Sequence, residues 1–375
     1  MRIGFDAKRA VQNNTGLGNY SRYVIEILSK YCPDNSYILF APRKKANSRL
    51  KTILSRVNVS FIFPHGIFRR LSSLWRTFGM AGDIRKQNLA VYHGLSGELP
   101  VGIKKTGVKS IVTIHDLIFL RYPEYYKPID RLIYRLKFKA ACKKADKIIA
   151  VSECTKRDAV LFFGIPEEKI AVVYQGCHPA FSADVLEEKK KAVVEKYGLP
   201  SRFLLNVGSI EARKNLLLAV RALKNLPDDV HLVAVGKSTP YQQEVERYAA
   251  KSGLSPRLHL LNSVVFDDLP AIYRLASIFI YPSFFEGFGI PVIEALSSSV
   301  PVIAATGSCL EEAGGSGSIY VNPNDETELS KRIAEILNSR ELSEKMSEAG
   351  KEYVQRFSEK NIATEIMNIY GLSQK

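Results

Sequence analysis

The sequence is poor in cysteine, with five in 375 residues, and contains one tryptophan. None of the cysteines forms a CxxC pair, and their number is odd; they are Cys32, Cys142, Cys154, Cys177 and Cys309. A disulfide framework and a zinc site are therefore not expected. Reduced thiols in a cytoplasm fit this pattern best.

The sequence also has no long apolar run. None approaches the ~20 residues that a membrane-spanning helix needs. At the N-terminus a short apolar segment soon meets Lys8 and Arg9, which is unlike a secretory signal. We therefore expect a cytoplasmic protein that does not cross a membrane. Low-complexity segments and short repeats are absent as well, so a folded chain of two domains is the natural expectation for this length.

Acidic residues are scarce in the first half of the chain. The net charge is +15 overall, but residues 1–180 carry +18 and the remainder carries −3. A basic half suggests nucleic acid, an anionic membrane or a phosphorylated substrate as the partner. The sequence lacks zinc-finger spacing and an R-G-F-x-F aromatic platform, so we expect no nucleic-acid partner. A basic nucleic-acid-binding protein stays as a remote alternative.

Short β-branched or aromatic runs alternate with segments of helical periodicity, which indicates an α/β fold. Most runs are apolar throughout, as parallel strands buried on both faces are. Two consecutive sets predict two doubly wound, Rossmann-like domains. The expected strands are 3–5, 37–40, 59–63, 90–93, 111–115, 147–151 and 171–174 in the first set, and 203–207, 231–235, 258–261, 278–281, 300–304 and 319–321 in the second.

The expected domains are residues 1–178 and 179–358. Pro179 and the polar and charged runs that follow it interrupt the pattern, which a fresh strand restarts at Phe203. The segment 359–370 predicts a helix with Ile362, Ile366 and Ile369 on one face. The end of the chain, 359–375, could cap the second domain or pack back on the first.

The most informative segment is Tyr281–Leu296, which reads YPSFFEGFGIPVIEAL. A strand ends at Tyr281, a glycine-rich turn follows, and Pro291 lies in the first turn of a helix that begins near Ile290. The free N–H groups of such a turn point to the carboxyl edge of a parallel sheet, where anionic groups bind. Glu286 and Glu294 flank this turn, and a carboxylate can accept hydrogen bonds from vicinal sugar hydroxyls.

The arrangement F-E-G-F-G-x-P-x-x-E-A resembles the signature of glycosyltransferase family 4, whose GT-B fold has two Rossmann-like domains facing across a cleft. The resemblance spans nearly the whole chain. It implies that Glu286 lies by the donor sugar and that Glu294 contacts the nucleoside ribose. The backbone of the turn would reach the sugar and the diphosphate; its residues are Gly287, Phe288, Gly289 and Ile290.

A second block, Asn206–Asn215, follows the first strand of the second domain. Its glycine is Gly208, and its adjacent cations are Arg213 and Lys214. Cations at the mouth of a sheet can offset the charge that develops on a diphosphate leaving group. The pair resembles the phosphate grip of the family. No D-x-D motif occurs in the chain, so we expect no metal and no cofactor, with the cations and helix amides doing that work.

Further candidates follow from the resemblance. The first βα loop, with Gly16 and Gly18, would face the donor phosphate. His115 would contact the donor sugar, which makes it a candidate catalytic residue with Arg213, Lys214 and Glu286. His93 and Asp116 are candidates for the acceptor side. The base would lie against the loop that follows residue 261; its candidate residues are Ser263, Val264 and Val265.

The implied reaction retains anomeric configuration and is usually drawn as front-face attack, so no side-chain nucleophile is assigned. The first domain would bind the acceptor and the second the nucleotide-sugar. The chain, with its segments His93–Ser96 and Tyr174–His178, resembles bacterial mannosyltransferases of surface-polysaccharide pathways. This resemblance suggests GDP-mannose as the donor and a glycan or lipid-linked acceptor. A UDP-sugar donor is the alternative. A Rossmann dehydrogenase is disfavoured because Gly16 and Gly18 do not continue as GxGxxG.

Two basic segments of the first domain suggest contact with an anionic membrane, which would make the protein peripheral on the inner face of the cytoplasmic membrane. The segment 61–78 interleaves aromatic residues with arginine and holds the single Trp75. The segment 131–147 predicts a helix in which Leu132, Leu136 and Ala140 face inward while the cations face outward. Two ordinary amphipathic helices with solvated faces are the alternative.

Overall fold

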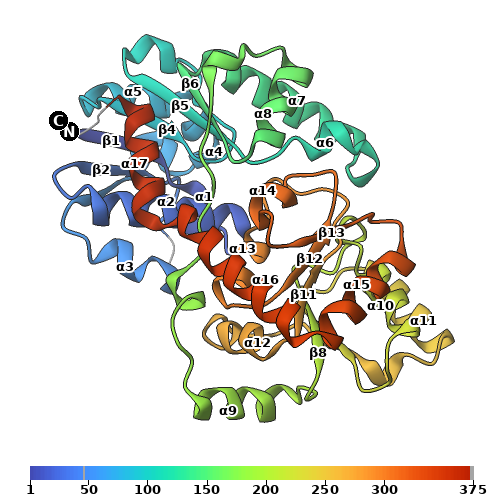
Figure 1. Ribbon diagram of the computed structural model, residues 1–375. Helices are drawn as coiled ribbons and strands as arrows, with labels where there is room; N and C mark the ends of the chain where they lie inside the picture. Colours follow the sequence, from blue (N-terminus) through green and yellow to red (C-terminus); the bar gives the residue numbers. More distant parts are fainter. Residues whose placement is uncertain (45–46, 372–375) are drawn as a thin grey trace. The chain divides into compact units, whose positions relative to one another are not determined.

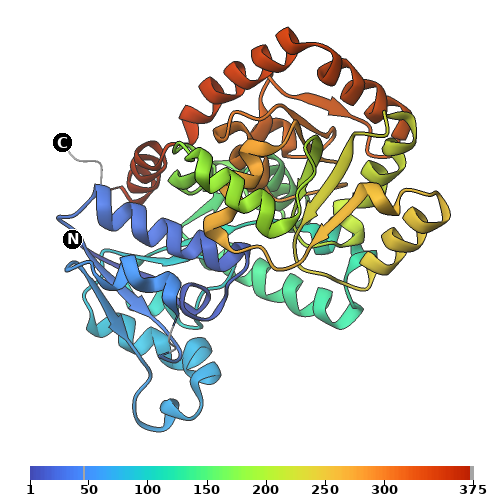
Figure 2. The same cartoon turned by 90° about the horizontal axis from the view of Figure 1, so that it is seen from below.

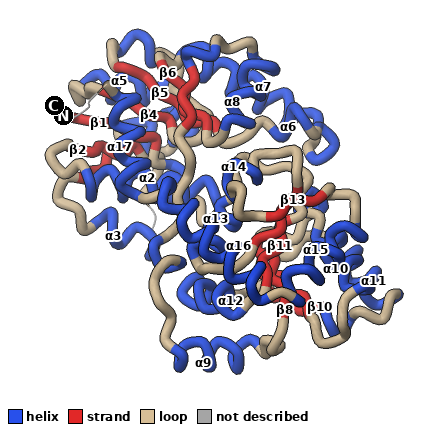
Figure 3. Tube along the Cα trace, viewed as in Figure 1, coloured by secondary structure: helices blue, strands red, loops and turns tan. Residues whose placement is uncertain are grey.

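The computed structural model describes residues 1–44 and 47–371. The chain divides into two compact units. Unit 1 contains Met1–Gln175 and the segment that begins at Ser358, and unit 2 contains Gly176–Phe357. The expected border after residue 178 thus falls just inside unit 2. In both units, helices lie on either side of a sheet (Figures 1 and 3).

Unit 1 is built on a parallel sheet of seven strands in the order β3-β2-β1-β4-β5-β6-β7. The strands are β1 Arg2–Asp6, β2 Ser36–Phe40, β3 Val59–Ile62, β4 Val91–Gly94, β5 Lys109–Ile114, β6 Lys147–Ala150 and β7 Ile170–Val172. The helices are α1 Lys8–Gln12, α2 Gly16–Tyr31, α3 Lys51–Leu54, α4 Ser72–Leu74, α5 Met80–Lys86, α6 Ile118–Arg121, α7 Pro128–Lys144, α8 Glu153–Phe163 and α17 Glu359–Tyr370, with a π-helical turn at Trp75–Gly79.

The last helix of the chain, α17, packs against α2 (Figure 2). Its first residue, Glu359, accepts from Lys30 near the C-terminal end of α2. Its bounds are those expected from the sequence, and Ile362 and Ile366 are both buried. Ile369 is only half-buried, and Tyr370 takes its place in the core. The ammonium of Lys109 donates to the carbonyl oxygens of both residues, 3.0 and 3.1 Å away, and so closes the C-terminal end of α17.

Unit 2 is built on a parallel sheet of six strands in the order β10-β9-β8-β11-β12-β13. The strands are β8 Phe203–Val207, β9 His231–Val235, β10 Leu258–Leu261, β11 Ile278–Tyr281, β12 Val302–Ala305 and β13 Ile319–Val321. The helices are α9 Glu187–Tyr197, α10 Leu216–Ala222, α11 Tyr241–Lys251, α12 Leu269–Leu275, α13 Ile290–Ser297, α14 Leu310–Gly314, α15 Glu326–Asn338 and α16 Arg340–Tyr353.

The predicted fold class is confirmed: both units are doubly wound α/β domains, and each of the thirteen expected strands is present with shifts of at most a few residues at the ends. In each sheet the strand order reverses beside the first strand, between β1 and β4 and between β8 and β11. Open α/β sheets bind ligands at the carboxyl ends of the strands that flank such a reversal. The fold therefore marks one edge of each unit as its candidate site.

The expectation that Leu132 and Leu136 face inward is wrong. Leu132 and Leu136 of α7 face outward, 58% and 62% exposed, because α7 is buried through Ala141 and Cys142 near its C-terminal end. Trp75 is 1% exposed and donates to the carboxylate of Asp83 over 2.7 Å, inside the core between α5 and the sheet. Among the described residues, no helix combines the length and apolar character that crossing a bilayer requires.

Candidate functional site

The candidate site of unit 2 begins where β8 and β11 separate. Their pairing ends at Leu205 and Phe279, and beyond it the side-chain amide of Asn206 donates to the Ile280 carbonyl over 2.8 Å. Gly208 follows with φ +152°, and a Cβ there would lie 3.0 Å from the side chain of Lys214. A glycine at this position therefore lets Lys214 lie across the end of β8.

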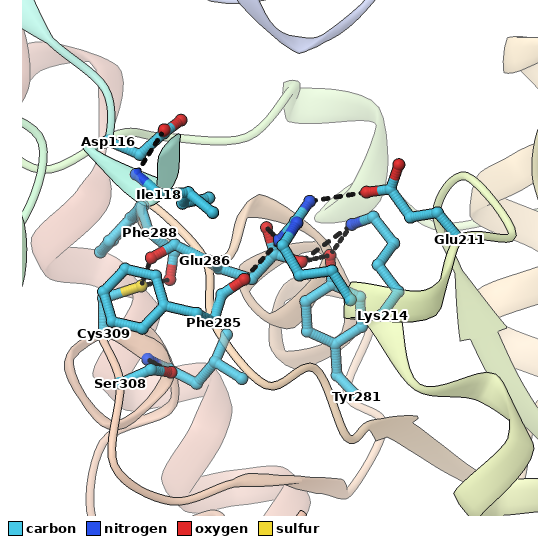
Figure 4. Close-up of polar contacts among 12 residues, drawn as sticks. Asp116, Ile118, Glu211, Lys214, Tyr281, Phe285, Glu286, Phe288, Ser308 and Cys309 are labelled. Atoms are coloured by element: carbon cyan, nitrogen blue, oxygen red, sulfur yellow. Dashed lines mark hydrogen bonds and ion pairs between the residues drawn. The ribbon is translucent and has the colours of Figure 1, made fainter. Parts of the chain in front are cut away.

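Arg213, Lys214 and Glu286 form a buried charged cluster at this edge (Figure 4). One guanidinium nitrogen of Arg213 lies 2.9 Å from Glu286 Oε2, and Lys214 Nζ lies 2.9 Å from Oε1. The Tyr281 hydroxyl donates to the same Oε1 over 3.1 Å. Arg213 also pairs with Glu211 at 2.7 Å. The structure thus brings together three predicted site residues, and it adds Glu211 and Tyr281.

The charges of this cluster fix the protonation state of Glu286. Burial alone would raise the pKa of its carboxyl group, but the neighbouring Lys214 and Arg213 outweigh burial and lower the pKa to about 2. The same pairing raises the pKa of Lys214 despite its burial. Glu286 is therefore an ionised hydrogen-bond acceptor at neutral pH and cannot act as a general acid.

The glycine-rich loop ends where α13 begins, as predicted. Gly289 has φ +125° and precedes Ile290, the first residue of α13. A Cβ at Gly289 would lie 2.9 Å from Leu310, so both backbone and packing require glycine there. Phe288 is 3% exposed and packs on Phe357, so its side chain is anchored in the core. Any ligand contact of Phe288 would therefore be made through its backbone.

Cys309 contacts this loop through its thiol and was not predicted as a site residue. Its thiol lies 3.0 Å from the carbonyl oxygens of both Glu286 and Phe288 and can donate to either of them (Figure 4). Cys309 is fully buried at the start of α14. No spacing rule links a single cysteine to a loop twenty or so residues earlier, so the sequence carried no signal for this contact.

Glu294 lies on α13, away from the charged cluster. Its Oε2 accepts a hydrogen bond of 2.8 Å from the hydroxyl of Tyr273 on α12. Burial raises the pKa of Glu294 to about 7, and the Tyr273 hydrogen bond opposes this only in part. The two glutamates therefore differ in charge near neutral pH, which agrees with separate roles.

The loop that follows β10 is the exposed part of the site. Ser263 and Val265 are exposed, and Val264 is half-buried. The Val265 N–H donates to the Tyr197 hydroxyl over 3.4 Å, which ties the loop to α9. In the sheet, β10 is separated from β8 by β9, so this loop lies two strands away from Lys214.

In unit 1 the two predicted loop glycines differ in what they do. Gly18 lies in the first turn of α2, where a Cβ would come 1.9 Å from the Asn13 carbonyl oxygen. Its lack of a side chain is therefore explained by close packing on the end of α1. Nothing lies within 4 Å of a Cβ at Gly16, the first residue of α2, so that position remains open to a ligand.

His115 follows β5, and both of its ring nitrogens form hydrogen bonds with residues of unit 1. Nε2 donates to the Leu95 carbonyl over 2.9 Å, which fixes the tautomer, and Nδ1 accepts from the Gln175 amide over 3.2 Å. Burial lowers the pKa of His115 to about 4, so the ring is neutral at physiological pH. The neighbouring Asp116 accepts from the Ile118 N–H over 3.2 Å (Figure 4).

The prediction that His93 serves the acceptor is not supported by its position. His93 is 0% exposed, and its ring nitrogens are bonded to Tyr370 and Thr113 at 2.7 and 2.8 Å. Burial lowers the pKa of the ring to about 3, so it stays neutral. His93 therefore holds α17 on the sheet and presents no nitrogen to a ligand.

The unit 2 site suits an anionic, hydroxylated ligand. It offers two cations, one carboxylate that is ionised at neutral pH, and the N-terminus of α13 beside a glycine-rich loop. Among the residues that the structure describes, no three His, Cys, Asp or Glu side chains gather as they would around a metal ion.

Comparisons with known proteins agree with this geometry. The family model "Glycosyltransferase Family 4" matches residues 21–181, and "Glycosyl transferases group 1" matches residues 188–353. O-antigen chain mannosyltransferase B from Escherichia coli is 26% identical over 99% of this chain and all of its own length. O-antigen chain mannosyltransferase RfbU from Salmonella typhimurium is 28% identical over 60% of each chain.

Among solved structures, HepE from Anabaena in complex with UDP and glucose has a TM-score of 0.75 at 17% identity and covers 99% of both chains. This likeness concerns the fold, which is that of GT-B glycosyltransferases. The two family models together account for nearly all of both units, and the mannosyltransferase relative aligns from end to end. The chain belongs to glycosyltransferase family 4 and is a glycosyltransferase enzyme related to bacterial O-antigen mannosyltransferases.

Proposed function

We propose that the protein transfers mannose from GDP-mannose to a glycan or a lipid-linked oligosaccharide in the synthesis of a bacterial surface polysaccharide, with retention of anomeric configuration. The observation that carries this proposal is the Arg213–Lys214–Glu286 cluster beside a glycine-rich helix start. The mannosyl donor is supported by the end-to-end relationship to O-antigen chain mannosyltransferase B.

In this proposal, unit 2 binds the donor. Arg213 and Lys214 bind the diphosphate, and the loop amides of Gly287–Ile290 add hydrogen bonds. Because Glu211 and Glu286 already pair with the cations, the diphosphate would share them and would gain most when its charge rises during bond cleavage. Glu286 accepts from hydroxyls of the donor sugar, and Glu294 accepts from the ribose hydroxyls.

Unit 1 binds the acceptor in this proposal. The acceptor hydroxyl attacks the anomeric carbon from the face that the diphosphate leaves, and the departing phosphate oxygen takes its proton. The Glu286 carboxylate stays ionised and the His115 ring stays neutral, so neither is a protonated general acid at neutral pH, and the front-face route assigns no side-chain nucleophile. In unit 1, the ring of His115 is neutral and nothing lies within 4 Å of a Cβ at Gly16, so both remain candidate ligand contacts.

A UDP-sugar is the alternative donor, and it is supported by the structural likeness to HepE, whose crystal structure contains UDP and glucose. The deciding experiment is calorimetric titration with GDP-mannose, UDP-glucose, UDP-N-acetylglucosamine and the free nucleotides. We expect the highest affinity for GDP-mannose. Preference for a UDP-sugar would overturn the donor assignment, and no binding of any nucleotide would overturn the proposal itself.

We also propose that transfer needs no metal ion, because two cations and the α13 N-terminus supply positive charge at the diphosphate. Product formation from GDP-mannose should be the same with and without excess chelator. An activity that is lost with chelator and restored by Mg²⁺ or Mn²⁺ would contradict this.

An anionic membrane is the proposed surface for unit 1. Four apolar residues of α7 are exposed on one side of the helix at helical spacing: Ile129, Leu132, Ile133 and Leu136. Arg131 and Arg135 alternate with them in the sequence. An exposed apolar row bordered by cations suits the interface of an anionic bilayer. The helix would lie on the membrane surface and would not cross it.

A further inference from the structure

Unit 1 has a pocket of about 130 Å³ whose wall contains a buried charged triad. Arg76 donates to Asp6 and Glu98, with nitrogen–oxygen distances of 2.7 and 2.6 Å. The side chains of Asp6 and Arg76 are 4% and 11% exposed. This site is separate from the residues that the sequence suggested for the acceptor, His93 and Asp116.

The position of the triad follows from the sheet. Asp6 is the last residue of β1, and Glu98 lies in the loop that follows β4. The strands β1 and β4 are neighbours, and the strand order reverses between them. The loop folds back tightly, since a Cβ at Gly94 would lie 2.1 Å from the Glu98 carbonyl oxygen. The triad thus occupies in unit 1 the ligand-binding edge that Lys214 and Glu286 occupy in unit 2.

The triad leaves a carboxylate able to bind hydroxyl groups. Asp6 uses Oδ2 for Arg76 and Oδ1 for the backbone N–H of Lys8, 3.1 Å away. Glu98 uses Oε2 for Arg76 and is a quarter exposed. Its second oxygen can accept from a sugar hydroxyl, while the ion pair with Arg76 fixes the orientation of the carboxylate.

Residues from the C-terminal half of α7 form another part of the pocket wall. Lys137, Ala140, Ala141 and Lys144 line it at a spacing that places them on one side of the helix. The two alanines add little bulk to this wall. The ammonium groups of Lys137 and Lys144 form no ion pair with the carboxylates that line the pocket. A ligand that matches the pocket carries hydroxyl groups at one end and an anionic group at the other.

We propose that this pocket is an acceptor subsite for a glycosyl phosphate group, with sugar hydroxyls on Glu98 and the phosphate on Lys137 and Lys144. The inference rests on the proposed transferase function and names the chemical class of its acceptor. Two sources share this chemistry: a free sugar phosphate, and a sugar linked through phosphate to a lipid. The exposed apolar row Ile129–Leu136 precedes the pocket residues along the same helix, so a lipid chain has a surface to lie on.

The test is calorimetric titration of the full chain with mannose 1-phosphate, glucose 1-phosphate, N-acetylglucosamine 1-phosphate and inorganic phosphate. Lys137→Ala/Lys144→Ala removes the pocket cations. Lys139→Ala/Lys143→Ala removes the same charge from positions of α7 that do not line the pocket. We expect saturable binding of at least one sugar phosphate, weakened about tenfold or more by the first pair and less than about twofold by the second.

A third variant, Glu98→Gln, tests the sugar end. It should weaken the sugar phosphate and should not weaken inorganic phosphate, because the proposal places the sugar hydroxyls on Glu98 and the phosphate on Lys137 and Lys144. Equal losses in the two lysine pairs, or no binding of any sugar phosphate, would overturn the inference. GDP and UDP are titrated in parallel: if they bind normally while sugar phosphates do not, the acceptor subsite fails and the transferase proposal stands.

The source of the ligand is distinguished with a decyl ester of the sugar phosphate that binds. A gain in affinity that disappears in Leu132→Ser/Leu136→Ser identifies a lipid-linked acceptor. An affinity equal to that of the free sugar phosphate identifies a soluble one. In either case the binding must be lost in Lys137→Ala/Lys144→Ala, and binding that survives in that variant would contradict the site.

Discussion

The hydroxyl of Tyr273 donates a 2.8 Å hydrogen bond to Glu294, whose pKa burial raises to about 7. Glu294 therefore gains its charge as the pH rises through 7. Ribose hydroxyls donate more strongly to a carboxylate than to a carboxylic acid, so donor affinity should increase between pH 6 and pH 8. Calorimetry of GDP-mannose binding at several pH values measures this.

The control is Glu294→Gln, which cannot ionise and should remove the pH dependence while lowering affinity at pH 8. If the variant keeps the slope of the unaltered protein, another group causes it. The free energy of unfolding should change in the opposite direction. Burial raises the pKa of Glu294 in the folded protein, so the protonated form stabilises the fold. This contribution is fully present below the pKa that Glu294 has in the unfolded chain, and it is lost as the pH rises through about 7.

Arg213→Ala should lower turnover about 100-fold or more, because one charge-assisted contact to the leaving diphosphate is lost in the transition state. Glu286 keeps Lys214 as a partner, so the fold should persist. The measurement is kcat with GDP-mannose beside a circular dichroism spectrum. Arg221→Ala is the matched control, since Arg221 makes a half-exposed pair with Glu326 outside the cluster. Near-normal turnover of Arg213→Ala would exclude the phosphate role.

Cys309→Ala should raise the KM for the donor more than it lowers kcat, because the thiol positions the carbonyls of Glu286 and Phe288 without touching the reacting atoms. Unfolding in urea should show a loss of about 1–2 kcal/mol. Cys142→Ala removes an equally buried thiol from unit 1 and serves as the control. If both variants change the donor KM alike, Cys309 has no positioning role.

Leu132→Ser/Leu136→Ser should weaken binding to vesicles that contain anionic lipid by about tenfold or more, since each leucine contributes apolar area to the bilayer interface. The thermal midpoint should not fall, because both side chains are exposed. Leu161→Ser changes a leucine of α8 that is 68% exposed and tests whether any exposed leucine matters. Unchanged vesicle binding in the double variant would contradict a membrane role for α7.

Much of the fold was predictable because buried parallel strands are read directly from short apolar runs, such as Phe203–Val207 and Ile278–Tyr281. The Arg213–Lys214–Glu286 cluster was also predictable. Arg213 and Glu286 follow two different strands, and parallel strands bring such loops to one edge. The sequence could not supply the orientation of α7, because helical spacing groups Leu132 with Leu136 but does not say whether that group is covered.

Contacts between residues far apart in the sequence could not be predicted either. His93 is held in the core by Tyr370, 277 residues later in the chain, so nothing near His93 indicates that its nitrogens are occupied. The Asp6–Arg76–Glu98 triad also draws its members from three distant segments. Trp75 and Arg76 looked like surface residues because their neighbours are basic, whereas each has a buried acidic partner elsewhere in unit 1.

The placement of α17 has a consequence for how the protein is made. A ribosome completes all of unit 2 before it reaches Ser358, yet the first unit to be started still lacks the helix that covers α2. Until Tyr370 emerges, His93 has no partner for Nδ1, and the part of α2 that contacts α17 is uncovered. Unit 1 therefore begins first, but its fold can be completed only with a segment that is made after the whole of unit 2.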